Sequence, residues 1–370
     1  MRLNFHGRLE DAPEIRAGFI GCGSHATRNL YPALQLAPVK LVSVCDLELE
    51  RARAVAAKFG ATTAYSDHRQ MLEREKLDAV FIVTNYDENG RPRYPALACD
   101  CLEAGLNVFL EKPPAATVAE IERMSAAAQK NDRFVMVGFK KMFFPANEKA
   151  RELMHAPSFG RVSLGSLQYP QRVPDAEQFR TYAAGRNDNQ VVSFLDHLCH
   201  PMSLLLYLFG MPESLYYDRS DSGAGVACFH MPTGAIVSLA MTHGASHNGG
   251  MERTMIVSDG GQHVTVENNL RVTLHRNPPV PAGQGYGSQT SYYQGAPEQT
   301  SAVWEPEFSL GQLYNKALFL LGYYGEVNEF ARAILERRAP SRGTLEQARQ
   351  ITGVFAAFAE GARREIRLQA

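Results

Sequence analysis

The stretch from Ile15 to Asp46 constrains the fold more than any other, because it has the pattern of strand, glycine turn, helix and second strand. Ile15–Ile20 is a short, mostly apolar run, as expected for a strand buried in a parallel sheet. It leads directly into Gly21–Ala26 (GCGSHA), which fits the pattern Gly-x-Gly-x-x-Gly/Ala. This order predicts a doubly wound α/β fold.

Each small residue of this turn has a physical role in binding a dinucleotide. Gly21 allows the tight turn, Gly23 lets a pyrophosphate approach the backbone, and Ala26 keeps the next helix close to the sheet. That helix offers free N–H groups and the positive end of its dipole to the phosphates. An ordinary glycine turn is the alternative, but the flanking strand and helix favour a dinucleotide site.

The acid that closes the second strand predicts which dinucleotide binds. Lys40–Cys45 is an apolar strand that ends at Asp46, roughly 20 residues beyond the turn. A carboxylate there accepts hydrogen bonds from the adenosine ribose and repels a 2′-phosphate, which predicts NAD rather than NADP. Arg51 and Arg53 lie close by in the sequence and provide the alternative, because they could bind a 2′-phosphate.

Length and composition exclude several classes of protein. The 370 residues suffice for two domains with full cores, and the net charge of −1 gives no reason to expect nucleic acid or an anionic membrane as a partner. Apolar runs such as Leu204–Phe209 are too short to span a bilayer, and the polar start Met1–Pro13 lacks the core of a signal peptide. The six cysteines contain no C-x-x-C pair. We therefore expect a cytoplasmic protein with reduced thiols and no metal site.

Strand and helix patterns alternate from Ile15 to about Gly138, which predicts one parallel sheet. Asp78–Thr84 is a buried strand whose end lies beside the first turn, so we expect Thr84 and Asn85 to line the cofactor crevice. The other elements expected here are the strands Asn107–Leu110 and Phe134–Phe139 and the helices Leu47–Phe59, Asp67–Glu75 with Ser66 as its cap, Tyr94–Ala104 and Thr117–Asn131.

Beyond Phe139 the pattern changes to short alternating segments separated by Gly and Asn, which predicts a large, mostly antiparallel open sheet in an α+β domain. Its expected strands are Val162–Tyr169, Leu215–Arg219, Ala224–His230, Ala235–Met241, Arg253–Ser258, His263–Glu267 and Leu270–His275. Helices are expected at Pro145–His155, Asn189–Gly210, Leu310–Arg337 and Leu345–Arg364. We therefore divide the chain into a domain of residues 14–141 and a domain of residues 142–370, and expect the helices after about residue 323 to pack back on the first domain.

The stretch Pro278–Pro306 is rich in Gly, Gln and Pro and is predicted to be irregular. It also carries aromatic residues, Tyr286, Tyr292, Tyr293 and Trp304. Aromatic faces suit sugar rings, but an arm that grips a neighbouring subunit uses the same residues. We favour the subunit contact and keep the sugar contact as the alternative.

Glu111-Lys112-Pro113 is the second informative motif. A lysine at the carboxyl end of a buried strand, followed by proline, points into the crevice rather than out to water. Near a nicotinamide it can hydrogen-bond the oxygen of the carbon being oxidised and stabilise alkoxide charge. The alternative is a surface Glu–Lys pair in a proline turn.

The third motif is the segment Asp196–His200, whose two end residues lie one helical turn apart. A carboxylate that holds an imidazole in one tautomer makes a proton acceptor suited to alcohol oxidation. The alternative is a histidine that merely fills the core of an apolar helix. Because the residue before a proline avoids the helical conformation, Pro201 favours a place at a helix start for this pair.

Taken in order, the glycine turn, Cys45-Asp46, Glu111-Lys112-Pro113, and Asp196 and His200 before Tyr207–Gly210 resemble the glucose–fructose oxidoreductase / inositol dehydrogenase / MocA family. The resemblance implies a Rossmann domain, an open-sheet α+β domain and an active site between them. It further implies NAD(P)-linked chemistry on a sugar, cyclitol or polyol, and a homodimer or homotetramer formed through the exposed face of the second sheet.

The resemblance also implies roles for individual residues. Lys112 would face the substrate, His200 would be the acid/base, and Asp196 would be its partner. The residues expected to bind the cofactor are Gly21, Cys22, Gly23, Ser24, His25, Asp46, Thr84, Asn85, Glu111 and Lys112. The chain departs from the family at Asn85–Tyr94, which is longer and richer in charge, and at Met142, which replaces an arginine and follows Lys140 and Lys141.

Three functions are compatible with these residues. The first is an NAD-dependent oxidoreductase that acts on a secondary alcohol of a sugar-like substrate. The second is a glycoside-cleaving enzyme that oxidises the sugar only transiently and recycles its NAD in place. The third is a non-catalytic NAD-binding sensor, which the joint presence of Lys112, Asp196 and His200 disfavours.

Overall fold

The computed structural model describes residues 12–246, 250–277, 301–306 and 316–368 and contains two β-sheets. The first sheet has six parallel strands in the order β3-β2-β1-β4-β5-β6, so the strand order reverses beside β1, as in dinucleotide-binding folds. Its strands are β1 (Ile15–Ile20), β2 (Val39–Cys45), β3 (Thr63–Tyr65), β4 (Ala79–Ile82), β5 (Asn107–Leu110) and β6 (Val135–Val137). The predicted Rossmann sheet is thereby confirmed.

Helices cover both faces of the first sheet, which explains why its central strands are apolar throughout. They are η1 (Ala26–Leu30), α1 (Tyr31–Leu34), α2 (Leu49–Phe59), α3 (His68–Arg74), α4 (Tyr94–Glu103) and α5 (Val118–Lys130). From near the C-terminus, α11 (Tyr323–Leu335) also lies on this sheet, where the Phe330 ring packs edge-on against Phe81 and Phe109 at 5.1 and 5.7 Å. The aromatic core under β4 and β5 therefore joins two distant parts of the chain.

The second sheet has nine strands in the order β14-β13-β12-β11-β7-β10-β9-β8-β15, and only β7 and β10 run parallel. Its strands are β7 (Val162–Tyr169), β8 (Ser214–Arg219), β9 (Gly225–His230), β10 (Ile236–Met241), β11 (Arg253–Ser258), β12 (Gln262–Glu267), β13 (Arg271–Arg276), β14 (Ser301–Trp304) and β15 (Glu365–Arg367). This mostly antiparallel sheet confirms the predicted fold class.

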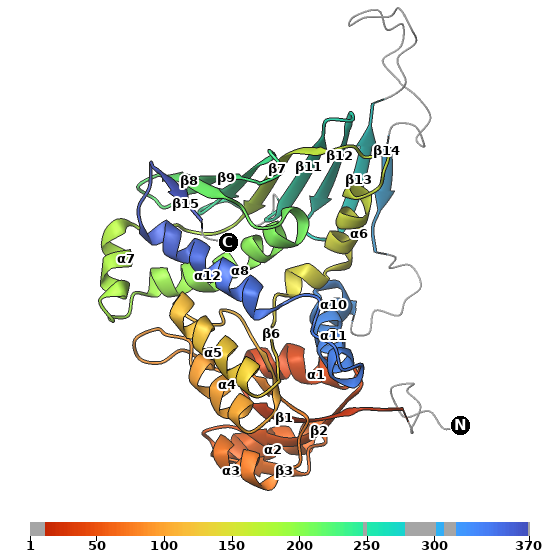
Figure 1. Ribbon diagram of the computed structural model, residues 1–370, viewed down its shortest axis with the longest axis vertical. Coiled ribbons are helices and arrows are strands. Elements are labelled where there is room, and N and C mark those ends of the chain that lie inside the picture. Colours follow the sequence, from red (N-terminus) through yellow and green to blue (C-terminus); the bar gives the residue numbers. More distant parts are fainter. Residues whose placement is uncertain (1–11, 247–249, 278–300, 307–315, 369–370) are drawn as a thin grey trace, which may run out of the picture.

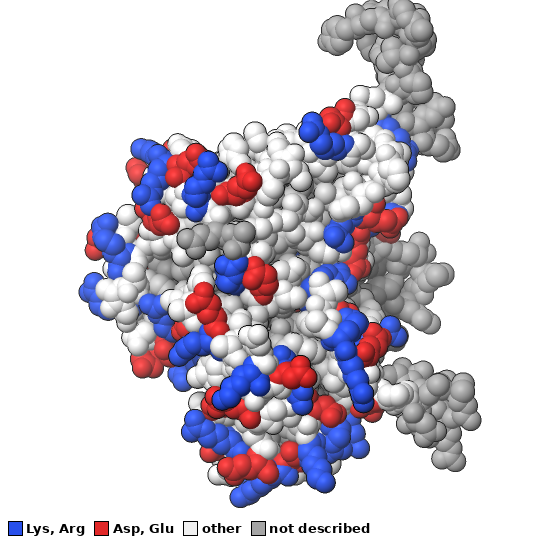
Figure 2. Space-filling view, in the orientation of Figure 1, with Lys and Arg blue, Asp and Glu red and all other residues white. Residues whose placement is uncertain are grey.

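Helices fill the space between the two sheets (Figure 1). They include α6 (Pro145–Met154), α8 (Asn189–Phe209) and α12 (Leu345–Ala359), with α7 (Ala176–Ala183) at one side and η2 (Lys140–Phe143) and α10 (Lys316–Leu320) nearby. α12 contacts both α5 and α8, so it links the layers. On the face drawn in Figure 2, Lys and Arg are interspersed with Asp and Glu over the helices of the first sheet.

The long helix α8 differs from its prediction in one respect. Pro201 lies inside the helix, so the expectation that Asp196 and His200 stand at a helix start was wrong. Burial of apolar neighbours such as Leu198 and Met202 offsets the loss of one backbone N–H at the proline. By length and composition α8 could cross a membrane, but 67% of its most apolar window is buried inside the fold.

Several local predictions were also corrected. Asp67 rather than Ser66 caps α3, because its side chain accepts from Arg69 N. The sequence did not indicate α7, and β14 pairs with β13 inside the stretch predicted to be irregular. The last predicted helix ends at Ala359, and the chain then forms β15 against β8. Tyr286, Tyr292 and Tyr293 lie outside the described residues.

Candidate active site

A cleft of about 810 Å³ lies at the carboxyl ends of β1, β2 and β4. A smaller hollow of about 240 Å³ adjoins it, and the two share Gly23, Val83, Thr84, Asn85, Tyr86 and Pro92. We call these the outer cleft and the inner hollow. All ten predicted cofactor residues line one or both: Gly21, Cys22, Gly23, Ser24, His25, Asp46, Thr84, Asn85, Glu111 and Lys112.

The glycine turn has the geometry that a dinucleotide pyrophosphate requires. Gly21 has φ +108°, and a Cβ there would lie 1.9 Å from the Val83 carbonyl oxygen, so only glycine allows the turn to touch the end of β4. At Gly23 a Cβ would meet nothing within 4 Å, so this side of the backbone is open. Among the described residues no side chain caps the helix that follows, and although Thr27 N donates to Gly23 O at 3.0 Å, the other N–H groups at its start can meet an anion. The turn therefore fits the cofactor.

Asp46 fixes the glycine turn to the end of β2. Its Oδ2 accepts from Cys22 N at 2.8 Å, and its Oδ1 accepts from Glu48 N at 3.0 Å and from Arg51 Nη1 at 3.4 Å. Arg51 is also paired with Glu48 at 2.6 Å. The sequence predicted Asp46 as a ribose acceptor, but the structure shows that the carboxylate also organises the turn itself.

Lys112 and Asp196 meet across the inner hollow. Lys112 follows β5, Asp196 lies on α8, and the Lys112 Nζ donates to both carboxylate oxygens of Asp196 at 2.8 Å. The Lys112 side chain is only 15% exposed, so the alternative of a surface Glu–Lys pair is wrong. Burial alone would lower the pKa of Lys112, but the charges of Asp196 and Glu111 outweigh it, so the pKa is raised and the ammonium is retained.

The predicted pairing of Asp196 with His200 is replaced by the contact with Lys112. Among the described residues, the hydrogen bonds of the Asp196 carboxylate come from Lys112 and from the Tyr86 hydroxyl at 2.9 Å. A buried ammonium is a stronger partner for a carboxylate than a neutral imidazole, which explains the outcome. Tyr86 was not predicted as a site residue, because nothing around it in the sequence marks it as a partner of a residue on α8.

His200 lies one turn further along α8, with its ring 5.9 Å from the Tyr169 ring and 6.5 Å from the His197 ring. Burial, together with the positive charges of Lys112, Lys141 and Lys140, holds the pKa of His200 well below its usual range. The imidazole is therefore neutral at pH 7, which is the state that a proton acceptor needs.

Behind Lys112 lies a buried group of ionisable side chains that the sequence did not reveal. Glu111 accepts from the Lys112 backbone N–H and lies 3.1 Å from His25 Nε2, and Lys140 Nζ donates to Tyr323 OH at 2.9 Å. Glu326 is fully buried, and neither of its carboxyl oxygens has a hydrogen-bond partner among the described residues. Burial and the charge of Glu111 raise the pKa of Glu326 well above its usual range.

Tyr169, at the end of β7, links His200 to an ion pair near the second sheet. Lys141, from η2, forms an ion pair with Glu252 just before β11, and its Nζ lies 5.9 Å from the centre of the Tyr169 ring. Asn269 also donates to Glu252, at 2.9 Å. The sequence showed Lys141 only as a neighbour of Met142, because its partner is distant along the chain.

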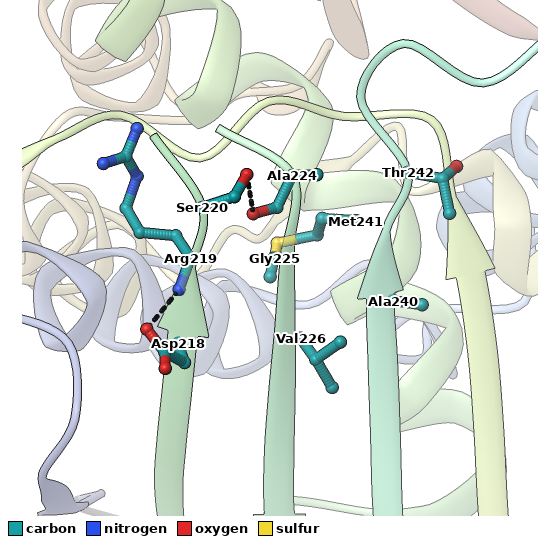
Figure 3. Close-up of a pocket in the computed structure, with 9 residues that line it drawn as sticks. All are labelled: Asp218, Arg219, Ser220, Ala224, Gly225, Val226, Ala240, Met241 and Thr242. Carbon is teal, nitrogen blue, oxygen red and sulfur yellow. Dashed lines mark hydrogen bonds between the residues drawn. The ribbon is translucent and has the colours of Figure 1, made fainter. Parts of the chain in front are cut away.

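Another hollow, of about 550 Å³, lies at the ends of β8, β9 and β10 (Figure 3). Its charged side chains are already engaged, since Asp218 accepts from Arg363 at 2.9 Å and Arg219 Nε donates to Val173 O at 3.2 Å. Ser220 donates to the Ala224 carbonyl. This hollow therefore lacks the converging acid, base and open backbone found beside the glycine turn.

Comparison with known proteins agrees with this location. The model of an oxidoreductase family with an NAD-binding Rossmann fold matches residues 15–139, and the model of the GFO/IDH/MocA C-terminal domain matches residues 147–264. These two matches contain the glycine turn, Lys112, Asp196 and His200.

Individual relatives are more distant. The chain is 24% identical over 207 residues to a myo-inositol 2-dehydrogenase from Thermotoga maritima and 28% identical over 218 residues to a D-apiose dehydrogenase from Paraburkholderia graminis. These alignments cover 56% and 58% of this chain and 58% and 54% of the relatives, so each relative is matched over little more than half its length.

Among solved structures, a dehydrogenase from Chromobacterium violaceum superimposes with a TM-score of 0.75 at 23% identity, covering 95% of this chain and 96% of the other. This likeness shows a common fold over almost the whole chain. The two family matches show that the chain belongs to the GFO/IDH/MocA family of oxidoreductases.

Proposed function

We propose that this protein is an NAD-dependent oxidoreductase that transfers hydride between the nicotinamide and a secondary alcohol or ketone of a sugar, cyclitol or related polyol. The observation that carries the proposal is the Lys112 ammonium, held at 2.8 Å by Asp196 in a hollow beside an open glycine turn. In this proposal residues 14–141 bind the cofactor, and residues 142–370 contribute the substrate side of the site.

The residues divide the chemistry between them. The N–H groups after Gly23 hold the phosphates, and a bound nicotinamide dinucleotide supplies the hydride acceptor or donor. Lys112 has three N–H donors, of which two point at Asp196; among the described residues no acceptor binds the third, which can donate to the substrate oxygen. There it stabilises developing alkoxide charge. His200, neutral at pH 7, takes the hydroxyl proton during oxidation and returns it during reduction.

The surroundings of Asp46 support NAD as the cofactor. The carboxylate lies in the outer cleft, where it can accept from a ribose hydroxyl and repel a 2′-phosphate. Arg51 is occupied by Glu48 and Asp46, and Arg53 is paired with Glu50 at 2.6 Å. Both arginines considered for a 2′-phosphate therefore already have carboxylate partners.

The exposed face of the second sheet supports the proposal that the protein is a homo-oligomer. Large apolar side chains stand on this face, including Val226 at 55% exposed, Ile236 at 40% and Leu164 at 39%. Such a row is typical of a surface that another subunit covers. We propose a homodimer or homotetramer, and a monomeric mass measured by light scattering would contradict it.

The test of the function begins with the cofactor that accompanies the purified protein. Mass spectrometry identifies any bound dinucleotide, and a screen of sugars and polyols with NAD then follows the absorbance of NADH. Net formation of NADH supports the oxidoreductase. Substrate consumption without net NADH supports the glycoside-cleaving alternative, in which the cofactor is recycled. Binding of NAD without any turnover across the screen would favour the sensor.

A further inference from the structure

The charged segment after Thr84 forms a closed loop between the two domains. We call residues 85–93 the strap. Asp87 organises its turn, because its Oδ1 accepts from Asn89 N at 2.9 Å and from Arg91 N at 2.8 Å, while Asp87 N donates to Arg91 O at 2.9 Å. Tyr86 and Pro92 face each other as an isolated β-bridge. The strap is therefore a defined structure with its own hydrogen bonds.

The far end of the strap is fastened to α7 and α8. Arg91 donates to the Tyr182 carbonyl at 2.8 Å, and its guanidinium lies 4.1 Å from the centre of the Tyr182 ring. In return, the Tyr182 hydroxyl donates to Gly90 O at 3.1 Å. A Cβ on Gly90 would lie 2.4 Å from Val192 Cγ2, so the backbone of the strap rests directly on α8. Residues of the first domain are thus anchored on the second.

The near end of the strap reaches the inner hollow through Tyr86. Its hydroxyl donates to Asp196 Oδ1, the same carboxylate that binds Lys112. Burial and the charge of Asp196 raise the pKa of Tyr86, so this side chain is a hydrogen-bond donor and not a base. Asp196 is therefore held by two groups of the first domain, one on the strap and one after β5.

We propose that Tyr86 is a positioning residue, which fixes the Asp196 carboxylate and through it the Lys112 ammonium, and that the strap sets this geometry by fastening the two domains together. The strap is needed because Lys112 and Asp196 belong to different domains. A small shift of one domain relative to the other would break the ion pair between them. Displacing a reacting group by about 1 Å can lower a rate roughly 100-fold. The inference rests on the proposed function for its kinetic part.

The first test is Tyr86→Phe, which removes only the hydroxyl. We expect kcat to fall roughly tenfold or more, the scale for losing one hydrogen bond to a charged group. The Kd for NAD should change far less than kcat, because the glycine turn and not the Tyr86 hydroxyl is expected to hold the phosphates. Tyr217→Phe is the matched control, since it removes a buried tyrosine hydroxyl bonded to Phe358 O, remote from the cleft. It should lower the melting temperature and leave kcat unchanged.

A second measurement does not depend on knowing the substrate. An acylating reagent reacts with the free amine of lysine; the folded protein is labelled for increasing times and then digested, and mass spectrometry of the peptide that contains Lys112 follows the rate at this residue. We expect faster labelling of Lys112 in Tyr86→Phe than in the unmodified protein, and no change in Tyr217→Phe. Tyr182→Phe, which loosens the strap without entering the hollow, should shift labelling in the same direction by a smaller factor.

These readouts separate failure of this inference from failure of the proposed function. If no polyol is turned over by the unmodified protein, the proposed function fails, and the labelling rate alone decides the role of Tyr86. Unchanged labelling of Lys112 in Tyr86→Phe overturns the inference in either case. Faster labelling of Lys112 with unchanged kcat also overturns the inference, because the reaction would then not depend on the hydrogen bond from Tyr86 to Asp196.

Discussion

At the glycine-turn end of the cleft the polar groups come from consecutive elements, β1, β2 and the helix between them, whereas at the Lys112 end they come from both domains. Asp46 and Cys22 belong to one strand–helix–strand unit, and their contact needs nothing from the rest of the chain. The contact of Lys112 with Asp196 requires β5 and α8 to be correctly placed against each other. The contact of Asp46 with the glycine turn is thus local in the sequence, whereas the contact of Lys112 with Asp196 depends on the whole fold.

The two ends also differ in their electrostatics. Around Asp46 the carboxylates and arginines are partly exposed, with Arg51 at 46%, so their interactions are screened by water. Around Lys112 the side chains are mostly buried, and this burial, together with neighbouring charges, lowers the pKa of His200 and raises the pKa of Glu326 far from their usual ranges. Substitutions around the inner hollow should therefore change turnover strongly. Substitutions around Asp46 in the outer cleft should have a modest effect on the preference for NAD over NADP.

The largest effect is expected at His200. We predict that His200→Ala lowers turnover by roughly 10²- to 10⁴-fold, the scale for losing a general acid or base. The lowered pKa of His200 also sets the pH dependence of the oxidation rate. An ordinary histidine has a pKa of about 6.5. Because the pKa of His200 lies well below that value, the imidazole stays neutral at pH 7, and the oxidation rate of the unmodified protein should fall only at a pH below 6.5. The sequence alone suggested a change between about pH 6 and 8.

Two measurements decide this prediction, the pH–rate profile and the melting temperature. His200→Ala should abolish the acidic limb of the profile. A histidine that only fills the core behaves differently: its loss would lower the melting temperature and leave the turnover of each folded molecule nearly unchanged. That result would leave the proton acceptor unassigned. It would also contradict the expectation that substitutions around the inner hollow change turnover more than those in the outer cleft.

Lys112→Ala should have the next largest effect. We expect turnover to fall by roughly two orders of magnitude, as for the loss of one electrostatic donor at a developing oxyanion. The Kd for NAD, measured by quenching of protein fluorescence or by calorimetry, should change little, because the phosphates bind at the other end of the cleft. A large loss of NAD affinity would show instead that the two ends are energetically coupled.

These differences explain what could be predicted from the sequence. Gly21, Gly23 and Asp46 carry a local pattern, so the first sheet and the lining of the outer cleft followed from it. Lys112 was placed at the cleft because a strand leads directly to it. The strands β7 to β13 could be predicted because apolar and polar residues alternate along each of them.

The pairings across the molecule could not be read in this way. Tyr86 and Lys112 meet Asp196 only because α8 crosses the end of the first sheet, and no local spacing encodes that crossing. Glu326 lies on α11, which returns to the first sheet from near the C-terminus. For the same reason, the spacing of Asp196 and His200 suggested a pair, but the more distant lysine became the partner.

Asp46 tests the outer end of the cleft. We predict that the unmodified protein binds NAD at least roughly tenfold more tightly than NADP, about 1.4 kcal/mol, and that Asp46→Ala narrows this ratio. Because Asp46 also accepts from Cys22 N, the variant should melt at a lower temperature. The ratio of the two Kd values, rather than either alone, isolates the effect on the 2′-phosphate. Equal affinities in the unmodified protein would contradict the assignment.

Arg51 should have the smallest effect, and it sharpens the same question. Its guanidinium is shared between Glu48 and Asp46 and is nearly half exposed, so we expect Arg51→Ala to change the Kd for NADP by no more than about threefold, within the range of exposed ion pairs. Arg53→Ala is the matched control, because Arg53 is paired with Glu50 and does not line the outer cleft. Titration of both variants with NADP would measure the difference. A loss of NADP affinity of tenfold or more in Arg51→Ala alone would mean that this arginine binds the 2′-phosphate, and the cofactor preference would then rest on Arg51 and not on Asp46.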